Sequence, residues 1–185
     1  MKAKIMTLFI ILLIITSSTT YASNVNKMPK KQGYNGIFNC GTTLKDALKI
    51  NNAVKQKVSN LLKYTSWDYQ KALILYKFVH NNIKYDSERT AIMVAKLQLG
   101  ACNIASGAQY AYDSKSGVCF EYATLFAAMA KTAELKVKID YNTYHMWNEF
   151  YDSYTNRWIF VDCTNGLFDE NIKDYHPEPY NSIKI

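Results

Sequence analysis

Apolar residues recur at helical spacing through the first half of the chain. Between residues 44 and 63, leucines, alanines and valines return at the spacing that places them on one face of a helix. A second helix is predicted from about Ser66, a residue type that caps helix starts, to about Ile83. A third helix is predicted over residues 88–99, where Gly100 ends it.

The pattern changes in the second half of the chain. The run "SGVCFEYATLFAAMAK" holds hardly a polar residue and predicts a buried helix that begins near Cys119. Apolar and polar positions then alternate, which predicts strands over residues 137–141, 144–151 and 157–162, the last two separated by the turn residues "DSYTN". The expected fold class is therefore α+β: a helical N-terminal half, with the Cys119 helix packed on an antiparallel β-sheet.

The N-terminal residues have the organisation of a secretory signal. Lys2 and Lys4 precede an apolar core that is shorter than a membrane-spanning helix, and Thr20-Tyr21-Ala22 provides small residues at a cleavage site. We therefore expect a signal peptide over residues 1–22, cleaved after Ala22, and a secreted or extracytoplasmic protein with no stable membrane anchor once the signal is removed. Residues 23–42 read as an irregular arm, and residues 43–185 as one domain.

Charge and composition exclude several classes of function. The formal net charge is +7, but the lysines are scattered and the arginines are Arg89 and Arg157 alone, so no basic stripe for nucleic acid is expected. The three histidines lie far apart in the sequence, with no CxxC or HxxxH spacing, so no metal site and no cofactor are predicted.

Cys119 directly precedes the apolar helix, and this position has two interpretations. Cysteine is among the most buried residue types, so packing alone explains a thiol there. A helix N-terminus, however, carries partial positive charge and unbonded N–H groups that stabilise a thiolate. The remaining residues must decide between packing and chemistry.

If the last two predicted strands form a hairpin, the position of its turn predicts which residues lie opposite each other. If its turn is centred between Ser153 and Tyr154, His145 faces Asp162 on the neighbouring strand. The sheet would then present an oriented histidine–aspartate pair to a thiol at the helix tip.

Three motifs in this region resemble those of the transglutaminase-like superfamily. They are "SGVCFEYATLFAAMA", "YHMWNEF" and "RWIFVDCT", and "YKFVHNNIKYD" resembles the segment that precedes the core in many members. The resemblance implies that Cys119 is a nucleophile, His145 its general base and Asp162 the acid that orients the base. It also implies an exported thiol acyl-transfer enzyme that forms an acyl-enzyme with protein or peptide amides, as a transglutaminase, deamidase or cysteine peptidase.

Other interpretations remain open. The domain could be a catalytically silent adhesion or interaction module with the same fold, or a structural protein in which Cys119 is oxidised. The cysteine helix also resembles arylamine N-acetyltransferases, although Lys115-Ser116-Gly117-Val118 replaces their Arg-Gly-Gly-x run, and an exported protein would not normally meet acetyl-coenzyme A.

Further residues have expected roles around this site. Gln109, in the predicted loop before Cys119, is the first candidate for a side-chain oxyanion donor, beside the Cys119 backbone N–H. Trp147 is expected to shield the histidine–aspartate pair from water. A strand that places Asp162 toward the site turns the next side chain, Cys163, away from it. Any disulfide is therefore expected to join Cys40 and Cys102.

Overall fold

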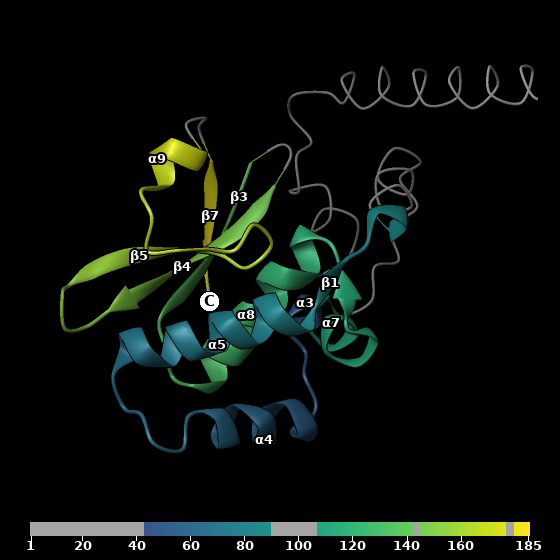
Figure 1. The fold of residues 1–185 in the computed structure, drawn as a ribbon, viewed down its shortest axis with the longest axis horizontal. Helices are drawn as coiled ribbons and strands as arrows, with labels where there is room; N and C mark the ends of the chain where they lie inside the picture. The colour runs from purple at the N-terminus through teal and green to yellow at the C-terminus, as the bar shows by residue number, and fades with distance from the viewer. Residues whose placement is uncertain (1–42, 90–106, 143–144, 177–179) are drawn as a thin grey trace, which may run out of the picture. The chain divides into compact units, whose positions relative to one another are not determined.

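The computed structural model describes residues 43–89, 107–142, 145–176 and 180–185 (Figure 1). The chain divides into two units, 1–32 and 33–185, and all the described residues belong to the second. The predicted signal peptide, the whole predicted arm, the bulk of the predicted helix 88–99 and both Cys40 and Cys102 lie outside the described residues. No described helix is both long and apolar enough to span a bilayer.

The predicted first helix is two helices. α3 covers Leu44–Ala47 and α4 covers Asn52–Leu61. The break lies at Asn51, whose side-chain oxygen accepts the Val54 N–H at 3.1 Å and so starts a new helix. An internal cap of this kind was missed because the apolar spacing continues across it.

α5 covers Asp68–Asn82, close to the predicted second helix. It starts one residue later than expected, because Trp67 rather than Ser66 occupies the N-cap position, without a side-chain cap. The chain then forms a short strand, β1 (Lys84–Tyr85), parallel to β2 (Ser116–Gly117). This pairing fixes the residues just before Cys119 to the end of α5.

The predicted loop before Cys119 is mostly helical. α7 covers Gly107–Ser114 and leads through β2 into α8, Cys119–Thr132, the predicted cysteine helix. α8 is buried along nearly its whole length, because α4, α5 and α7 pack on it from one side and the sheet from the other (Figure 1). The helix therefore carries Cys119 into the centre of the domain at a fixed position.

The sheet is antiparallel and five-stranded, in the order β6-β5-β4-β3-β7 (Figure 1). Its elements are β3 (Val137–Tyr141), β4 (Met146–Asp152), β5 (Arg157–Asp162), β6 (Leu167–Phe168) and β7 (Asn181–Lys184), with helix α9 (Ile172–Tyr175) between β6 and β7. The three predicted strands and the α+β class are confirmed, and β6, α9 and β7 are additions. One sheet face, including Ile139, Phe150 and Ile159, is buried in the core.

The β4–β5 register differs from the predicted one by two residues. Asn148 lies opposite Val161, and continuing this register places Trp147, not His145, opposite Asp162. A two-residue shift preserves the face that each side chain occupies, because side chains alternate with a period of two. His145 and Asp162 thus remain on one face as diagonal neighbours.

Candidate active site

Cys119 is the first residue of α8, and its side chain is almost fully buried. The turn before it is tight: a Cβ on Gly117 would lie 2.5 Å from the Glu121 Cβ, so only glycine fits there. Cys119 therefore lies at the N-terminus of α8, where the partial positive charge of the helix dipole is concentrated.

His145 lies one residue before β4, and Asp162 is the last residue of β5. The His145 Nε2 is 2.7 Å from the Asp162 Oδ2, which confirms the predicted proximity of the two side chains. The Asn142 side chain accepts the His145 backbone N–H at 2.8 Å and fixes the chain where it enters the strand. The imidazole is thereby held by its ring nitrogen and by its backbone.

The Asp162 carboxylate accepts several further hydrogen bonds from the turn that follows β5. The backbone N–H groups of Thr164 and Asn165 donate to Oδ1 at 2.9 and 3.1 Å, and the Asn165 Nδ2 donates to Oδ2 at 2.8 Å. Burial favours the neutral acid, but the neighbouring His145 and His176 imidazoles and the Asn165 backbone N–H outweigh it and hold the pKa of Asp162 well below its usual range. Asp162 is therefore ionised at neutral pH.

The electrostatics of His145 follow from its two neighbours. Burial opposes the charged ring, but side-chain hydrogen bonds to Asp162 and Cys119 outweigh this effect and raise the pKa of His145 to about 10. Because Nε2 is bonded to Asp162, Nδ1 is the nitrogen left to exchange a proton with the Cys119 thiol. The three residues therefore form a chain of thiol, imidazole and carboxylate, as the sequence predicts.

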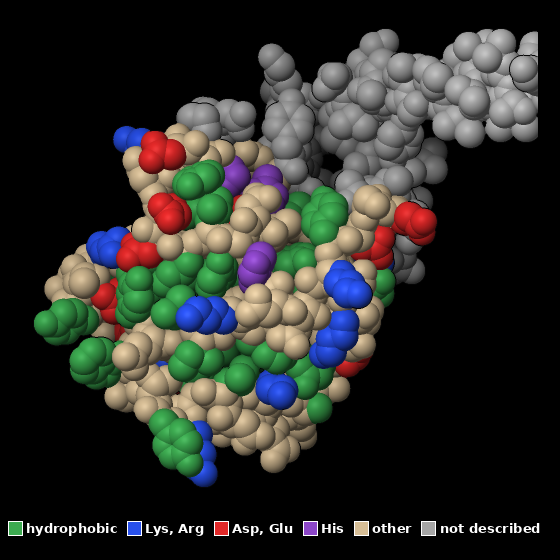
Figure 2. All heavy atoms as spheres, in the orientation of Figure 1, with side chains coloured by type: hydrophobic (Ala, Val, Ile, Leu, Met, Phe, Trp, Pro, Cys, Tyr) green, Lys and Arg blue, Asp and Glu red, His purple; other side chains and the backbone are tan. Residues whose placement is uncertain are grey.

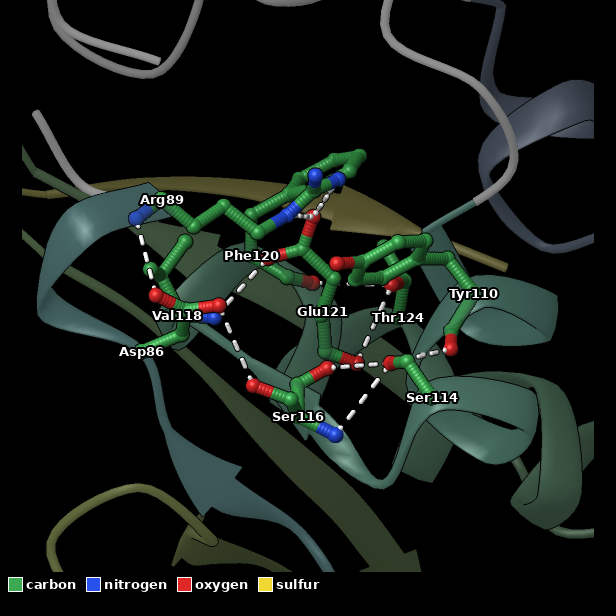
Figure 3. A network of polar contacts seen from close by, with 9 residues as sticks. All are labelled: Asp86, Arg89, Tyr110, Ser114, Ser116, Val118, Phe120, Glu121 and Thr124. Carbon is green, nitrogen blue, oxygen red and sulfur yellow. Dashed lines mark hydrogen bonds and ion pairs between the residues drawn. The ribbon is translucent and has the colours of Figure 1, made fainter. Parts of the chain in front are cut away.

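A second polar network fixes the start of α8 (Figure 3). The fully buried Glu121 accepts the Val118 N–H at 2.9 Å, and Arg89 donates to its other oxygen from Nε and Nη2 at 2.8 and 2.7 Å. The Arg89 guanidinium also lies 3.8 Å from the Tyr110 ring centroid. This network was missed, although a glutamate three residues after a helix cap is a capping-box signal.

Hydrogen bonds of the Gln109 side chain join it to residues outside the catalytic group. Its Oε1 accepts the Asn51 backbone N–H at 2.7 Å, and its Nε2 donates to both carboxylate oxygens of Asp113 at 3.0 and 2.9 Å. These bonds tie α7 to the start of α4. The role of Gln109 as an oxyanion donor stays a prediction. In the structure its side chain has a structural role, because it joins α7 to the start of α4.

Two aromatic or imidazole rings lie beside His145. Trp147 is buried, and its ring centroid is 6.0 Å from that of His145. His176, which follows α9, has its ring centroid 5.2 Å from that of His145 and its Nε2 3.6 Å from the Asp162 Oδ2. Sequence reasoning missed His176 because it lies 31 positions after His145 in the sequence.

Cys119 and Cys163 are the two cysteines in the described part of the chain. Both are buried, and no disulfide joins them. Burial and the nearby Asp162 raise the pKa of Cys163, so its thiol stays protonated. The Cys40–Cys102 bridge stays a prediction, since both residues lie outside the described ranges.

Comparison with known proteins adds family information to this geometry. Residues 53–163 match the Transglutaminase-like superfamily. A stretch of 59 residues, 31% of this chain, is 36% identical to a peptide-N(4)-(N-acetyl-beta-glucosaminyl)asparagine amidase of Candida glabrata and covers 17% of it. The Saccharomyces cerevisiae protein of the same name is 32% identical over 59 residues, 31% of this chain and 16% of that protein. The match thus spans about a sixth of these relatives.

A solved structure of a Parabacteroides distasonis protein superposes on 68% of this chain and 26% of its own. The TM-score is 0.48 and the sequence identity is 15%.

Proposed function

The chain belongs to the transglutaminase-like superfamily, and on this basis we propose that it is an exported thiol enzyme that attacks amide bonds of proteins or peptides. The observation that carries the proposal is the 2.7 Å contact between His145 and Asp162, with the same imidazole hydrogen-bonded to Cys119. A purely structural domain requires none of these three groups in this arrangement.

The first half of the reaction uses the imidazolium form of His145. The Cys119 thiolate attacks the amide carbonyl carbon, and the backbone N–H of Cys119 at the helix N-terminus is the oxyanion donor that we assign. When the C–N bond breaks, His145 gives its proton to the leaving amine. Asp162 stabilises the charged ring before this transfer and holds the correct tautomer after it.

The second half releases the acyl group from the thioester. Water or a primary amine attacks the thioester carbonyl and gives its proton to His145, and Cys119 leaves as a thiolate. Water as the acceptor gives hydrolysis or deamidation, and an amine gives cross-linking. The buried neighbours of the pair, including Trp147, limit access of water from the sheet side.

The decisive experiment compares Cys119→Ser with Cys163→Ser. The mature protein is incubated with a glutamine-containing protein such as casein, with or without a primary amine, and released ammonia, incorporated amine and new peptide termini are measured. We expect turnover by the wild type and by Cys163→Ser, and none by Cys119→Ser.

Alkylation provides the readout that does not need a substrate. Iodoacetamide at neutral pH should modify Cys119 far faster than Cys163, as mapped by mass spectrometry, because only Cys119 has a cationic imidazole beside it. Equal, slow alkylation of both cysteines would overturn the enzyme proposal and favour a silent interaction domain. Rapid alkylation without turnover on any amide would favour a different acyl donor, as in the N-acetyltransferase-like alternative.

Export has its own test. The signal-like residues 1–22 support it, and N-terminal sequencing of protein collected outside the producing cell should begin at Ser23. Retention of the full-length chain inside the cell would contradict it.

A further inference from the structure

Asp162 lies between two imidazoles, and the proposed reaction uses only one of them. The His176 Nε2 lies 3.6 Å from the same Oδ2 oxygen that His145 contacts at 2.7 Å. Its side chain is 9% exposed, and within the described residues its Nε2 has no hydrogen-bond partner. A buried nitrogen of this kind normally finds a partner, so its orientation toward the carboxylate needs an explanation.

The His176 ring is held firmly in this orientation. It stacks on Trp147 with a centroid separation of 4.0 Å and an interplanar angle of 7°, and the edge contact to Phe160 has centroids 5.7 Å apart. The His176 backbone N–H donates to the Ile172 carbonyl at 2.7 Å, which anchors the residue to α9. The nitrogen is therefore preorganised, with little rotamer freedom to lose on binding a ligand.

The three side chains have the chemistry of a transition-metal site. One ligand atom each from His145, Asp162 and His176 lies within 4.8 Å of the others. Zinc binds imidazole nitrogen and carboxylate oxygen at about 2.0–2.2 Å, so ligand atoms of a tetrahedral site lie about 3.3–3.6 Å apart. The His176–Asp162 separation of 3.6 Å meets this requirement, and the 2.7 Å contact between the His145 Nε2 and the Asp162 Oδ2 lengthens when the ion enters between the two atoms.

The site can be reached from outside because the His145 side chain is 16% exposed, whereas Asp162 is 1% exposed. Histidine side chains reach the surface on the face of the molecule shown in Figure 2. A fourth ligand position is left for water, as in zinc sites with three protein ligands.

We propose that Zn²⁺ binds reversibly between His145, Asp162 and His176 and thereby inhibits the enzyme. A metal on the His145 Nε2 leaves its Nδ1 protonated, so the ring cannot accept a proton from a thiol. The ion also takes the place of the proton that His145 shares with Asp162. The inhibition rests on the proposed function, whereas the binding does not.

This geometry differs from ordinary zinc poisoning of a thiol enzyme, in which the cysteine is itself a ligand. Because the His145 Nε2 is bonded to Asp162, we place the Cys119 thiol at Nδ1, on the other side of the imidazole from the metal. The two possibilities therefore make opposite predictions for Cys119→Ser and for His176→Gln.

The test is calorimetric titration of Zn²⁺ into chelator-treated Cys119→Ser protein. We expect one ion per chain with a Kd in the micromolar range or below. The added His176→Gln substitution should weaken binding at least tenfold, and the matched His80→Gln substitution should leave it unchanged, because His80 is bonded to the Cys163 carbonyl outside the site. Zinc binding that needs Cys119, or that is indifferent to His176, overturns the proposal.

A second measurement does not depend on how the His176 variant folds. In Cys119→Ser protein with ¹⁵N-labelled histidine, Zn²⁺ should shift the Nε2 resonances of both His145 and His176, and leave those of His80 in place. A shift confined to His145 contradicts the proposed site. If both histidines shift but the wild-type protein shows no activity on amides, the proposed function fails and the metal site stands.

Discussion

Asp162 and Asp140 are both fully buried aspartates on the same five-stranded sheet, yet their pKa values move in opposite directions. The pKa of Asp162 lies well below the usual carboxyl range, whereas that of Asp140 is raised to about 7. Burial is the largest influence on each residue and raises both pKa values. The difference must therefore come from the neighbours of each carboxylate.

Asp162 is surrounded by donors. Two backbone N–H groups, the Asn165 amide and the His145 ring all have hydrogen-bond contacts to its two oxygens. Asp140 accepts a hydrogen bond from the Ser182 hydroxyl at Oδ1, but its Oδ2 has no hydrogen-bond partner within the described residues. The acidic Glu149 is close by and raises the Asp140 pKa further, and the nearby Lys138 lowers it only in part.

The surroundings of Asp162 stabilise its negative charge, whereas those of Asp140 favour the protonated acid. Similar burial gives an ionised aspartate where donors converge, and a proton-binding aspartate where a second carboxylate lies nearby. A local turn supplies most of the donors to Asp162, through the residues that directly follow β5. His145 and His176, which come from other parts of the chain, lower the pKa of Asp162 most, and this turn adds backbone and side-chain donors to its two oxygens.

The largest expected effect on activity comes from removing the negative charge of Asp162. Asp162→Asn should reduce kcat/KM on an amide substrate by about 10³–10⁴-fold, because an amide cannot stabilise the imidazolium and favours the wrong tautomer. The matched substitution Asp140→Asn should leave kcat/KM within about threefold of the wild-type value. Steady-state kinetics on the two variants measure the difference.

A smaller loss in Asp162→Asn than in Asp140→Asn would reverse the comparison. Circular dichroism of both variants checks that the loss reflects chemistry rather than unfolding.

A third buried carboxylate, Glu121, has a raised pKa although a cation lies beside it. Burial raises its pKa, and hydrogen bonds from Arg89 and the Val118 N–H lower it only in part. Arg89→Met keeps the apolar stem near Tyr110 but leaves Glu121 without its cation, so the free energy of unfolding should fall by about 3–5 kcal/mol at neutral pH. Urea denaturation measures this change.

The double variant Arg89→Met/Glu121→Gln distinguishes the reason for that loss. If the unpaired charge is responsible, the double variant should regain most of the stability that the single variant loses. A double variant as unstable as Arg89→Met would instead attribute the loss to the packing of Arg89 on Tyr110.

The sequence predicted those parts of the structure that local patterns determine. The strands over residues 137–141 and 157–162 and the start of the helix at Cys119 follow from side-chain period and turn residues. The association of His145 with Asp162 was predicted for a partly wrong reason, since the register is two residues from the expected one. It survived because such a shift leaves both side chains on one face.

The missed parts depend on contacts between distant segments. Arg89 reaches Glu121, and His176 reaches Asp162, only after the helices and sheet have packed. The break at Asn51 was missed for a different reason: polar capping there interrupts a helix whose apolar spacing continues. The spacing of apolar residues predicts which face of a helix or strand is buried. It does not predict internal helix caps or polar contacts between distant segments.

A single donor to Asp162 should have a smaller effect than the carboxylate itself. Asn165→Ala removes the Nδ2 hydrogen bond to Oδ2 and leaves the two backbone donors to Oδ1 in place. A hydrogen bond to a charged group contributes about 1.5–3 kcal/mol, so kcat/KM should fall by roughly 10–100-fold. Asn165→Asp is the contrasting variant: it adds a second carboxylate, as Glu149 does at Asp140, and should be worse than alanine. Equal kinetics for both variants would contradict the electrostatic reading.

The smallest expected effect on activity, but an informative one on stability, comes from titrating Asp140. Its pKa is raised from 3.8 to about 7 in the folded protein, first by burial and further by Glu149, so between these values the folded protein holds a proton that the unfolded chain has released. The free energy of unfolding attributable to Asp140 therefore decreases as pH rises from about 4 to about 7, and is constant above that.

Asp140→Asn should flatten this dependence and stabilise the protein at pH 7.5, because an amide resembles the protonated acid and can donate to Glu149. Asp162 predicts the opposite trend at lower pH: its pKa is depressed, so its contribution is present above the usual carboxyl pKa and is lost as pH falls below it. Urea denaturation at pH 4.5, 6.0 and 7.5 on wild type and Asp140→Asn measures the first trend. Parallel pH profiles for the two proteins would mean that Asp140 stays ionised throughout, and that neighbouring donors matter less than the comparison with Asp162 requires.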